Sequence, residues 1–255
     1  MCKSRNEINN EIIKLWKEYH KKKKAAELFW PNLHLPAPEK IDLLVIGLNP
    51  SHKFPKHKIK VSEKIGTSPT KNTIFQKIID REYTDRDIVD ALKYSNQGYQ
   101  VDDILDFEKI GQECHNYFQK FWDLGKSIFL TAKTTYHIDL YQFRESNSEL
   151  IKKFIVNHSD FFSKQAELTF KYIEELKPKI IFVASKPASD EFYKKYKPQF
   201  DEKWGCYKIT IDGNETPLIL SGMITQSRSI DDYSFERLIW HMKFINTALN
   251  NVQAP

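Results

Sequence analysis

Short apolar runs alternate with longer periodic segments along the chain. The runs are only a few residues long and rich in branched and aromatic residues, which is the pattern of buried strands rather than of helices. One sequence between two of the runs, Asp212-Gly213-Asn214, is typical of a β-hairpin turn. The runs that predict strands are residues 43–46, 136–141, 179–184, 206–211 and 217–220.

The longer segments show the spacing of amphipathic helices. In the first of them, Ile8, Ile12 and Trp16 recur every four residues, with mainly polar residues between them. Pro187 is placed to open a later helix, because proline is well tolerated in a first helical turn. The segments that predict helices are residues 5–29, 72–81, 111–124, 146–176, 187–196 and 232–250.

This order of elements predicts an α/β fold. Strands that alternate with helices form parallel sheets with helices on both faces. We therefore expect a three-layer α/β/α architecture with a central, mainly parallel sheet of four to five strands. Prolines interrupt the chain before the first strand, so we expect an N-terminal helix and Pro-rich connector over residues 1–38 and an α/β domain over residues 39–255. Residues 82–110 are mixed and acidic, and they predict no element.

Composition narrows the class of protein. The chain has 255 residues, 40% of them hydrophobic, and its net charge of +5 permits an acidic partner such as DNA without requiring one. Cys2, Cys114 and Cys206 are far apart and form no CxxC pair, so neither a zinc knuckle nor an iron–sulfur cluster is expected. No apolar run reaches the ~20 residues of a membrane span, and no signal-peptide pattern is present. We expect a cytoplasmic protein.

A polar turn, Gly47-Leu48-Asn49-Pro50-Ser51, follows the first predicted strand. Open α/β sheets bind their ligands at the carboxyl ends of the strands, which places the Asn49 amide in that crevice. Pro50 fixes the next backbone step. The alternative is an ordinary strand-to-loop turn, in which Asn49 serves only to tolerate an unusual backbone angle.

This turn resembles the first motif of the uracil-DNA glycosylase superfamily, Gly-x-(Asp/Asn)-Pro, and its asparagine is similar to that of the mismatch-specific branch. Residues 70–75 (TKNTIF) resemble the start of that branch's second helix, and residues 179–193 (KIIFVASKPASDEFY) resemble the strand before the final motif. The resemblance extends over roughly residues 40–245. It implies that Asn49 orients the water that attacks the sugar. It also implies a base pocket that includes Gly47, Leu48, Pro50, Ser51, His52 and Phe54.

A second motif lies at residues 136–144, YHIDLYQFR. Relatives have Asn-x4-Arg in this place, and aligning on Arg144 puts Asp139 where their asparagine reads uracil. An aspartate accepts a hydrogen bond from the exocyclic amine of cytosine, so Asp139 favours a cytosine-type base. Tyr141 would line the pocket, and His137 could replace a histidine of the family that is missing elsewhere. The alternatives are an aspartate that caps the following turn and a structural histidine.

A third motif is expected after the strand at residues 217–220. Relatives have His-Pro-Ser there, with the histidine bonded to the leaving base, but this chain has neither the histidine nor the proline. Its polar residues can instead bind DNA phosphates or the base. The alternative is that Arg228 pairs with Asp231 at the start of a helix. The residues expected to contact DNA are Lys53, Arg144, Ser221, Gly222, Thr225, Gln226 and Arg228.

The resemblance implies a monofunctional DNA glycosylase that flips a base out and hydrolyses its N-glycosidic bond, leaving an abasic site. Such an enzyme needs no metal and no cofactor. Asp139 favours a modified cytosine as the substrate, as in the DNA of some phages, and such a substrate would suit a role in anti-phage defence. A uracil or mismatch repair glycosylase is one alternative. A catalytically inactive member that binds DNA or a nucleotide is another. We expect a monomer with DNA as its partner and no membrane association.

Overall fold

The computed structural model describes residues 4–22, 29–51, 74, 77–78, 81–93, 99–224 and 230–252. Contacts divide the chain into two compact units, each built from three separated segments. Unit 1 comprises Met1–Pro36, Asn49–His115 and Tyr141–Tyr172, and unit 2 comprises Ala37–Leu48, Asn116–Leu140 and Ile173–Pro255. The domain boundary expected at residue 38 stays a prediction.

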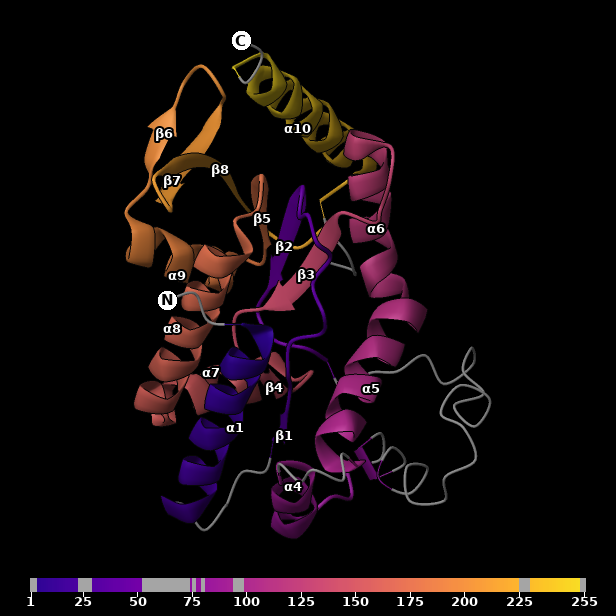
Figure 1. Cartoon of the computed structure of the whole chain (residues 1–255), viewed down its shortest axis with the longest axis vertical. Coiled ribbons are helices and arrows are strands. Elements are labelled where there is room, and N and C mark those ends of the chain that lie inside the picture. The colour runs from indigo at the N-terminus through magenta and orange to yellow at the C-terminus, as the bar shows by residue number, and fades with distance from the viewer. Residues whose placement is uncertain are drawn as a thin grey trace. The chain divides into compact units, whose positions relative to one another are not determined.

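Unit 2 is built on a six-stranded sheet with the strand order β3-β2-β5-β8-β7-β6. The pairs β2–β3, β2–β5 and β5–β8 are parallel, whereas β7–β8 and β6–β7 are antiparallel. Figure 1 shows β2 lying beside β3, which comes much later in the chain. The strands are β2 (Leu43–Gly47), β3 (Thr135–Asp139), β5 (Ile180–Ala184), β6 (Gln199–Asp201), β7 (Cys206–Ile211) and β8 (Asn214–Ser221).

The α/β class is confirmed, but the prediction of a mainly parallel sheet of four or five strands was wrong, because the sheet is mixed and has six. The turn between β7 and β8 explains the mixing. Asp212 and Gly213 have φ values of 49° and 79°, as in the tight turns that join antiparallel neighbours. Strand β6 was not predicted because its three residues are largely exposed and show no apolar pattern.

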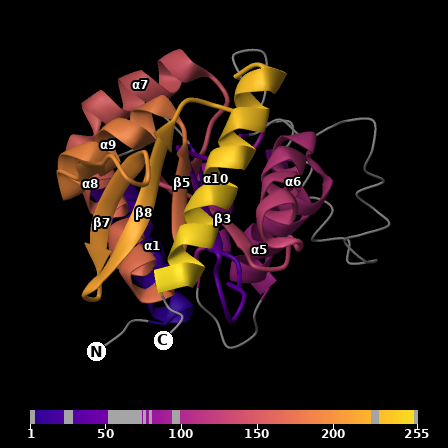
Figure 2. The same ribbon diagram turned by 90° about the horizontal axis from the view of Figure 1, so that it is seen from above.

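Helices cover both faces of this sheet, consistent with a three-layer arrangement. On one face, Val45 and Phe182 share a core with Phe121 of α6 (Asn116–Phe129) and Met242 of α10 (Asp232–Val252). On the other face, α9 (Lys186–Tyr196) contacts β5 and β8 and buries Phe192. Figure 2 shows α9 and α10 on opposite sides of these strands. The helices predicted at residues 187–196 and 232–250 are thus confirmed within one or two residues.

Unit 1 is mainly helical around an aromatic core. The Nε1 atom of Trp16 donates to the carbonyl oxygen of Gln142 at 3.1 Å, and Phe143, Phe154 and Phe162 pack against one another. A short antiparallel pair joins β1 to β4. The elements are α1 (Arg5–Lys22), β1 (Trp30–Pro31), α4 (Asp85–Ala91), α5 (Tyr99–Cys114), β4 (Phe143–Arg144), α7 (Ser148–Asn157) and α8 (Ser159–Leu176), whose last residues belong to unit 2.

Several helix predictions need correction. The segment 146–176 holds two helices, because the backbone of His158 leaves the helical region at φ −131° and ψ 40°. The segment 111–124 likewise spans the break between α5 and α6. Residues 82–110, which predicted no element, contain α4 and most of α5. The first helix is described only to Lys22, and of the helix expected at 72–81 only residues 74 and 77–78 are described as helical.

Within the described ranges, none of the helices combines the length and the apolar character that a membrane crossing requires.

Candidate functional site

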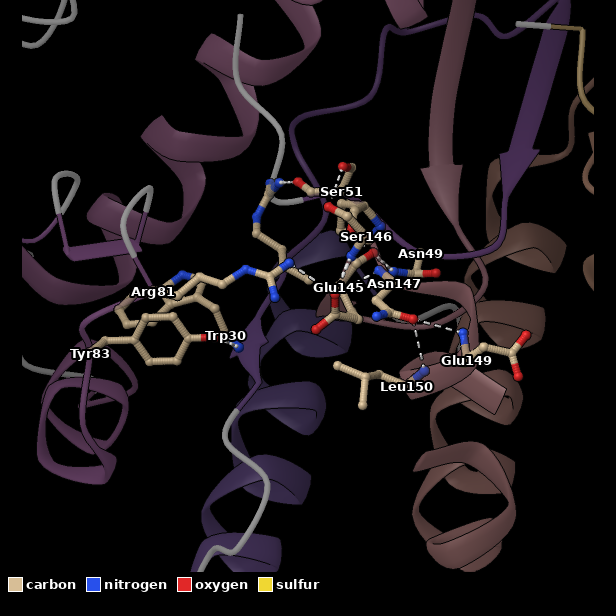
Figure 3. Close-up of polar contacts among 12 residues, drawn as sticks. Trp30, Asn49, Ser51, Arg81, Tyr83, Glu145, Ser146, Asn147, Glu149 and Leu150 are labelled. Atoms are coloured by element: carbon tan, nitrogen blue, oxygen red, sulfur yellow. Dashed lines mark hydrogen bonds and ion pairs between the residues drawn. The ribbon is translucent and has the colours of Figure 1, made fainter. Parts of the chain in front are cut away.

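The Asn49–Ser51 turn is held by the segment that follows β4, and both belong to unit 1. The amide nitrogen of Glu145 donates to the carbonyl oxygen of Pro50 at 3.1 Å. In return, Nδ2 of Asn49 donates to the carbonyl oxygen of Glu145 at 2.8 Å. The hydroxyls of Ser51 and Ser146 lie 2.7 Å apart and share a hydrogen bond. Figure 3 shows these contacts between segments almost a hundred residues apart in the sequence.

These bonds fix the orientation of the Asn49 amide. Its Nδ2 also donates to the carbonyl oxygen of Pro50 at 3.0 Å, so both amide hydrogens point at backbone carbonyls. Carbonyl oxygens only accept, so nitrogen must occupy this position. The Oδ1 atom of this half-buried side chain is then an acceptor that bonds to none of the described residues. A neutral amide cannot take up a proton as a base, but an acceptor held in this way can orient a water molecule.

A buried carboxylate holds this turn in place. Oε1 of Glu145 accepts from the backbone amides of Ser146 at 2.6 Å and Asn147 at 2.7 Å. Nη2 of Arg81 donates to the same oxygen at 2.9 Å, from the opposite side in Figure 3. Three donors compensate the burial of the charge. Glu145 was missed in the sequence, where only its position directly after Arg144 could have pointed to it.

Two further groups fix the surroundings of Glu145. Oδ1 of Asn147 accepts from the amides of Glu149 at 3.0 Å and Leu150 at 3.3 Å, which caps α7. The hydroxyl oxygen of Tyr83 accepts from the backbone amide of Trp30 at 3.1 Å. Burial raises the pKa of Tyr83 to about 12, so this phenol stays protonated at neutral pH.

Arg144, expected to contact DNA, faces the interior of unit 1. Its guanidinium forms an ion pair with the buried carboxylate of Glu108 and lies 4.4 Å from the ring centroid of Phe107. Nη1 also donates to the carbonyl oxygen of Ser51 at 3.1 Å. Only 3% of Arg144 is exposed. The arrangement favours a positioning role for Arg144, because its guanidinium holds the end of the Asn49–Ser51 turn.

In unit 2, Asp139 lies against Gly47 at the ends of β3 and β2. The two residues are partners in the parallel ladder, and the amide of Leu140 donates to the carbonyl oxygen of Gly47 at 3.0 Å. Oδ1 of Asp139 occupies the place that a Cβ atom on Gly47 would take. Only glycine therefore lets this buried carboxylate lie across the tip of β2. The hydrogen bond expected from its oxygens to an amine stays a prediction.

His137 is packed as a core residue. Its ring stacks on Phe121 at 5.3 Å between centroids and meets the ring of Phe118 edge-on at 5.0 Å. Burial lowers the pKa of His137 to about 3, so its imidazole is neutral at physiological pH. Nε2 lies 3.9 Å from Oδ1 of Asp139, beyond hydrogen-bond distance. These contacts favour the structural alternative over a role in stabilising the leaving base.

The remaining candidates are spread over the two units. In unit 1, Tyr141 is buried and meets the ring of Phe162 edge-on at 4.9 Å. In unit 2, Leu48 is half-buried. The carbonyl oxygen of Ser221, at the end of β8, accepts from the Ser189 hydroxyl at 3.0 Å. Gly222 next to it is exposed. His52, Lys53, Phe54, Thr225, Gln226 and Arg228 lie outside the described residues.

Asp231 supports part of the alternative stated for the third motif. Its Oδ1 accepts from the amide of Ser234 at 2.8 Å, in the first turn of α10. The predicted helix start is therefore confirmed.

The described segments bring together no three His, Cys, Asp or Glu side chains that could hold a metal ion. No protein-family model matches the chain, and no curated protein matches its sequence. The candidate site is therefore defined by its own residues and by the geometry of each unit.

Proposed function

We propose that this protein is a monofunctional DNA glycosylase that hydrolyses the N-glycosidic bond of a flipped-out, non-standard base and leaves an abasic site. The observation that carries the proposal is the anchored amide of Asn49. Two backbone carbonyls hold Nδ2, so that Oδ1 is directed as an acceptor after a buried parallel strand. Open α/β sheets bind their ligands at this end of their strands, and an acceptor held there can orient a water molecule, which supports the proposal.

In the proposed reaction, the bond between C1′ and the base nitrogen breaks, and its electron pair leaves with the base. The sugar acquires oxocarbenium character, as in other glycoside hydrolysis. Oδ1 of Asn49 accepts a hydrogen bond from water and directs its oxygen toward C1′. The oxygen bonds to C1′, and a proton from the water ends on the departed base. Because Asn49 is neutral, it contributes through positioning and not through charge.

The substrate class follows from Asp139 as a second part of the proposal. A buried carboxylate accepts from an exocyclic amine of the cytosine type, whereas it would place acceptor against acceptor at O4 of uracil. We therefore favour a modified cytosine, as in phage DNA, and a role in anti-phage defence. Normal cytosine carries the same amine, so the enzyme must also recognise the group that the modification adds in order to leave normal cytosine uncleaved. Repair of uracil or mismatches is the alternative, and it requires Asp139 to be protonated or turned away.

Two observations favour a second class of function. Both hydrogen bonds that Asn49 forms with the described residues hold the turn itself, and Arg144 is buried rather than presented to DNA. A catalytically inactive protein that binds DNA or a nucleotide would need the turn only as a structural element. The two classes differ in whether abasic sites are formed.

The test is an assay for alkali-labile sites in DNA that contains uracil, hydroxymethylcytosine or glucosylated hydroxymethylcytosine. We expect breaks in at least one modified DNA, and a loss of about 10²–10³-fold for Asn49→Ala. Asn214→Ala is the matched control, because Asn214 is an exposed asparagine in a hairpin turn. DNA binding without breaks in any of these substrates would support the inactive class. Unchanged turnover of Asn49→Ala would remove Asn49 from the mechanism.

A further inference from the structure

Helix α10 carries an exposed aromatic stripe, which we define as Tyr233, Arg237, Trp240 and Phe244. The exposed fractions of the three aromatic residues are 75%, 68% and 44%. Their spacing of four, three and four residues places all members of the stripe on one side of the helix. The rings of Trp240 and Phe244 are nearly parallel, with centroids 6.0 Å apart. The two rings thus lie against each other on the exposed side of the helix.

This stripe is not part of the core of unit 2. The opposite side of α10 supplies Met242 and Ile245, both fully buried, to the core beneath the sheet. An amphipathic helix needs only that one apolar side. A contiguous apolar surface on a second side, facing solvent, is typical of an interaction site.

We propose that the aromatic stripe is the interface of a homodimer, in which two α10 helices pack antiparallel about a two-fold axis beside Trp240. The charges that flank the stripe select this arrangement. Glu236 and Lys243 lie on the same side of the stripe and at nearly equal distances from Trp240 along the helix. The two-fold axis therefore brings Glu236 opposite the partner's Lys243, and the reverse pair forms by symmetry.

The same axis gives Arg237 a place in the interface. Its guanidinium falls at the level between the partner's Trp240 and the partner's Phe244, where it can lie over an aromatic face. Within its own chain, Nη2 of Arg237 donates to the Ser234 hydroxyl at 2.8 Å, which holds the side chain along the stripe. Aromatic residues and arginine are the residues that most often dominate the binding energy of protein interfaces.

Other occupants fit less well. Parallel packing of two α10 helices would place Arg237 and Lys243 beside their own copies, which is unfavourable. A nucleic acid would need a basic surface, but Asp232 and Glu236 balance the two cations along this part of α10. A second copy of the chain is the partner whose charges match. This dimer differs from the monomer expected from the sequence, and it does not depend on the proposed glycosylase activity.

The test is the molecular mass of the full chain, measured by analytical ultracentrifugation over a concentration series up to about 100 μM, where micromolar contacts are populated. We expect a monomer–dimer equilibrium. Trp240→Ser should raise the dimer Kd at least tenfold, as for a central aromatic anchor. Phe200→Ser is the matched control, because Phe200 is 57% exposed on strand β6 and should leave the Kd unchanged.

A charge exchange tests the antiparallel register. Glu236→Lys should weaken the dimer by about threefold or more, because it puts like charges in both symmetric pairs. The double variant Glu236→Lys/Lys243→Glu should restore the original Kd. A wild-type chain that stays monomeric, or a dimer that Trp240→Ser leaves intact, overturns the proposal. A dimer that the charge exchange fails to restore overturns the register.

Discussion

The carboxylate of Asp139 fills the space above Gly47 in the neighbouring strand, at the carboxyl end of both. The two residues face each other in the parallel ladder, and a methyl group on Gly47 would overlap Oδ1 of Asp139. Nε2 of His137 lies 3.1 Å from the position that the added methyl carbon would take, so a second polar atom also bounds this space. The backbone of Gly47 has an ordinary conformation. Glycine is therefore needed here because there is no room for a Cβ atom, and not because the backbone adopts a special conformation.

Replacing Gly47 by alanine tests this relationship. We expect Gly47→Ala to destabilise the protein by about 1–3 kcal/mol, because the added methyl forces the buried carboxylate of Asp139 from its place. Denaturant unfolding measures the change. Gly222→Ala is the control, because nothing lies within 4 Å of its added methyl group. Equal stability of the two variants would contradict the close approach.

The orientation of the Asn49 amide predicts the effect of a nearly isosteric substitution. Asn49→Asp replaces the donor by an oxygen that would face the carbonyls of Pro50 and Glu145. Leaving these acceptors against another acceptor costs about 1–3 kcal/mol. We expect Asn49→Asp to be less stable than Asn49→Ala, in which water can reach both carbonyls. If thermal unfolding shows Asn49→Asp to be as stable as wild type, the amide is not anchored as described.

The buried ion pair of Arg144 with Glu108 predicts a large asymmetry between single and double variants. Arg144→Met leaves the Glu108 carboxylate buried without its cation and should cost about 3–5 kcal/mol. Arg144→Met/Glu108→Leu should recover much of this loss, because no buried charge remains. Arg86→Ala is the control: the Arg86 side chain is 92% exposed and should change stability by no more than about 0.5 kcal/mol. A mild Arg144→Met phenotype would contradict the buried pair.

Stability should fall with acid because of a buried neutral histidine. Burial lowers the pKa of His137 from 6.5 to about 3 in the folded chain. The unfolded chain binds the proton first, so this contribution is complete above pH 6.5 and is lost between pH 6.5 and about 3. The loss is at most about 1.4 kcal/mol per pH unit. In unfolding measured from pH 7 to 5, His137→Phe should show a shallower slope, and an identical slope would contradict this contribution.

Base preference is the most direct test of the role proposed for Asp139. Wild type should act on a modified cytosine and leave uracil at least tenfold less cleaved, because mispaired buried polar groups cost about 1–3 kcal/mol. Asp139→Asn should shift the preference toward uracil, since an amide can donate to O4. Competition between the two DNA substrates measures the ratio. Efficient uracil release by wild type, with no action on modified cytosine, would favour the alternative of a uracil repair glycosylase.

The apolar runs were sufficient to locate most of the sheet. Residues 43–46 and 179–184 read as buried strands because both faces of a central parallel strand are covered, and the structure buries β2 and β5 throughout. The position of Asn49 after β2 followed from the same pattern. The helical residues 99–110 were missed because their apolar face is interrupted by acidic residues, including the buried Asp103 and Glu108.

The groups that hold the turn were beyond local patterns. Glu145 pairs with Arg81, which lies 64 residues away in the sequence. Its carbonyl oxygen accepts a hydrogen bond from the side chain of Asn49, which lies 96 residues away. Nothing in the neighbouring sequence distinguishes such a buried carboxylate from a solvated one. The sequence around Arg144 likewise does not reveal that this arginine is buried, because its partner Glu108 comes from a separate helix. Arg144 was therefore expected at a DNA surface. Pairings of this kind depend on the tertiary fold.

The way in which the chain builds its two units limits how it can be divided. Three segments of unit 1 alternate with three segments of unit 2, so neither unit is encoded by one continuous stretch of gene. Domains that are exchanged between proteins as cassettes normally have two ends in an exposed linker. Here a single recombination point between residues 37 and 172 would split both units, and a point outside that range would still split one of them. Neither unit can therefore be grafted onto another protein by transferring one continuous segment of this chain.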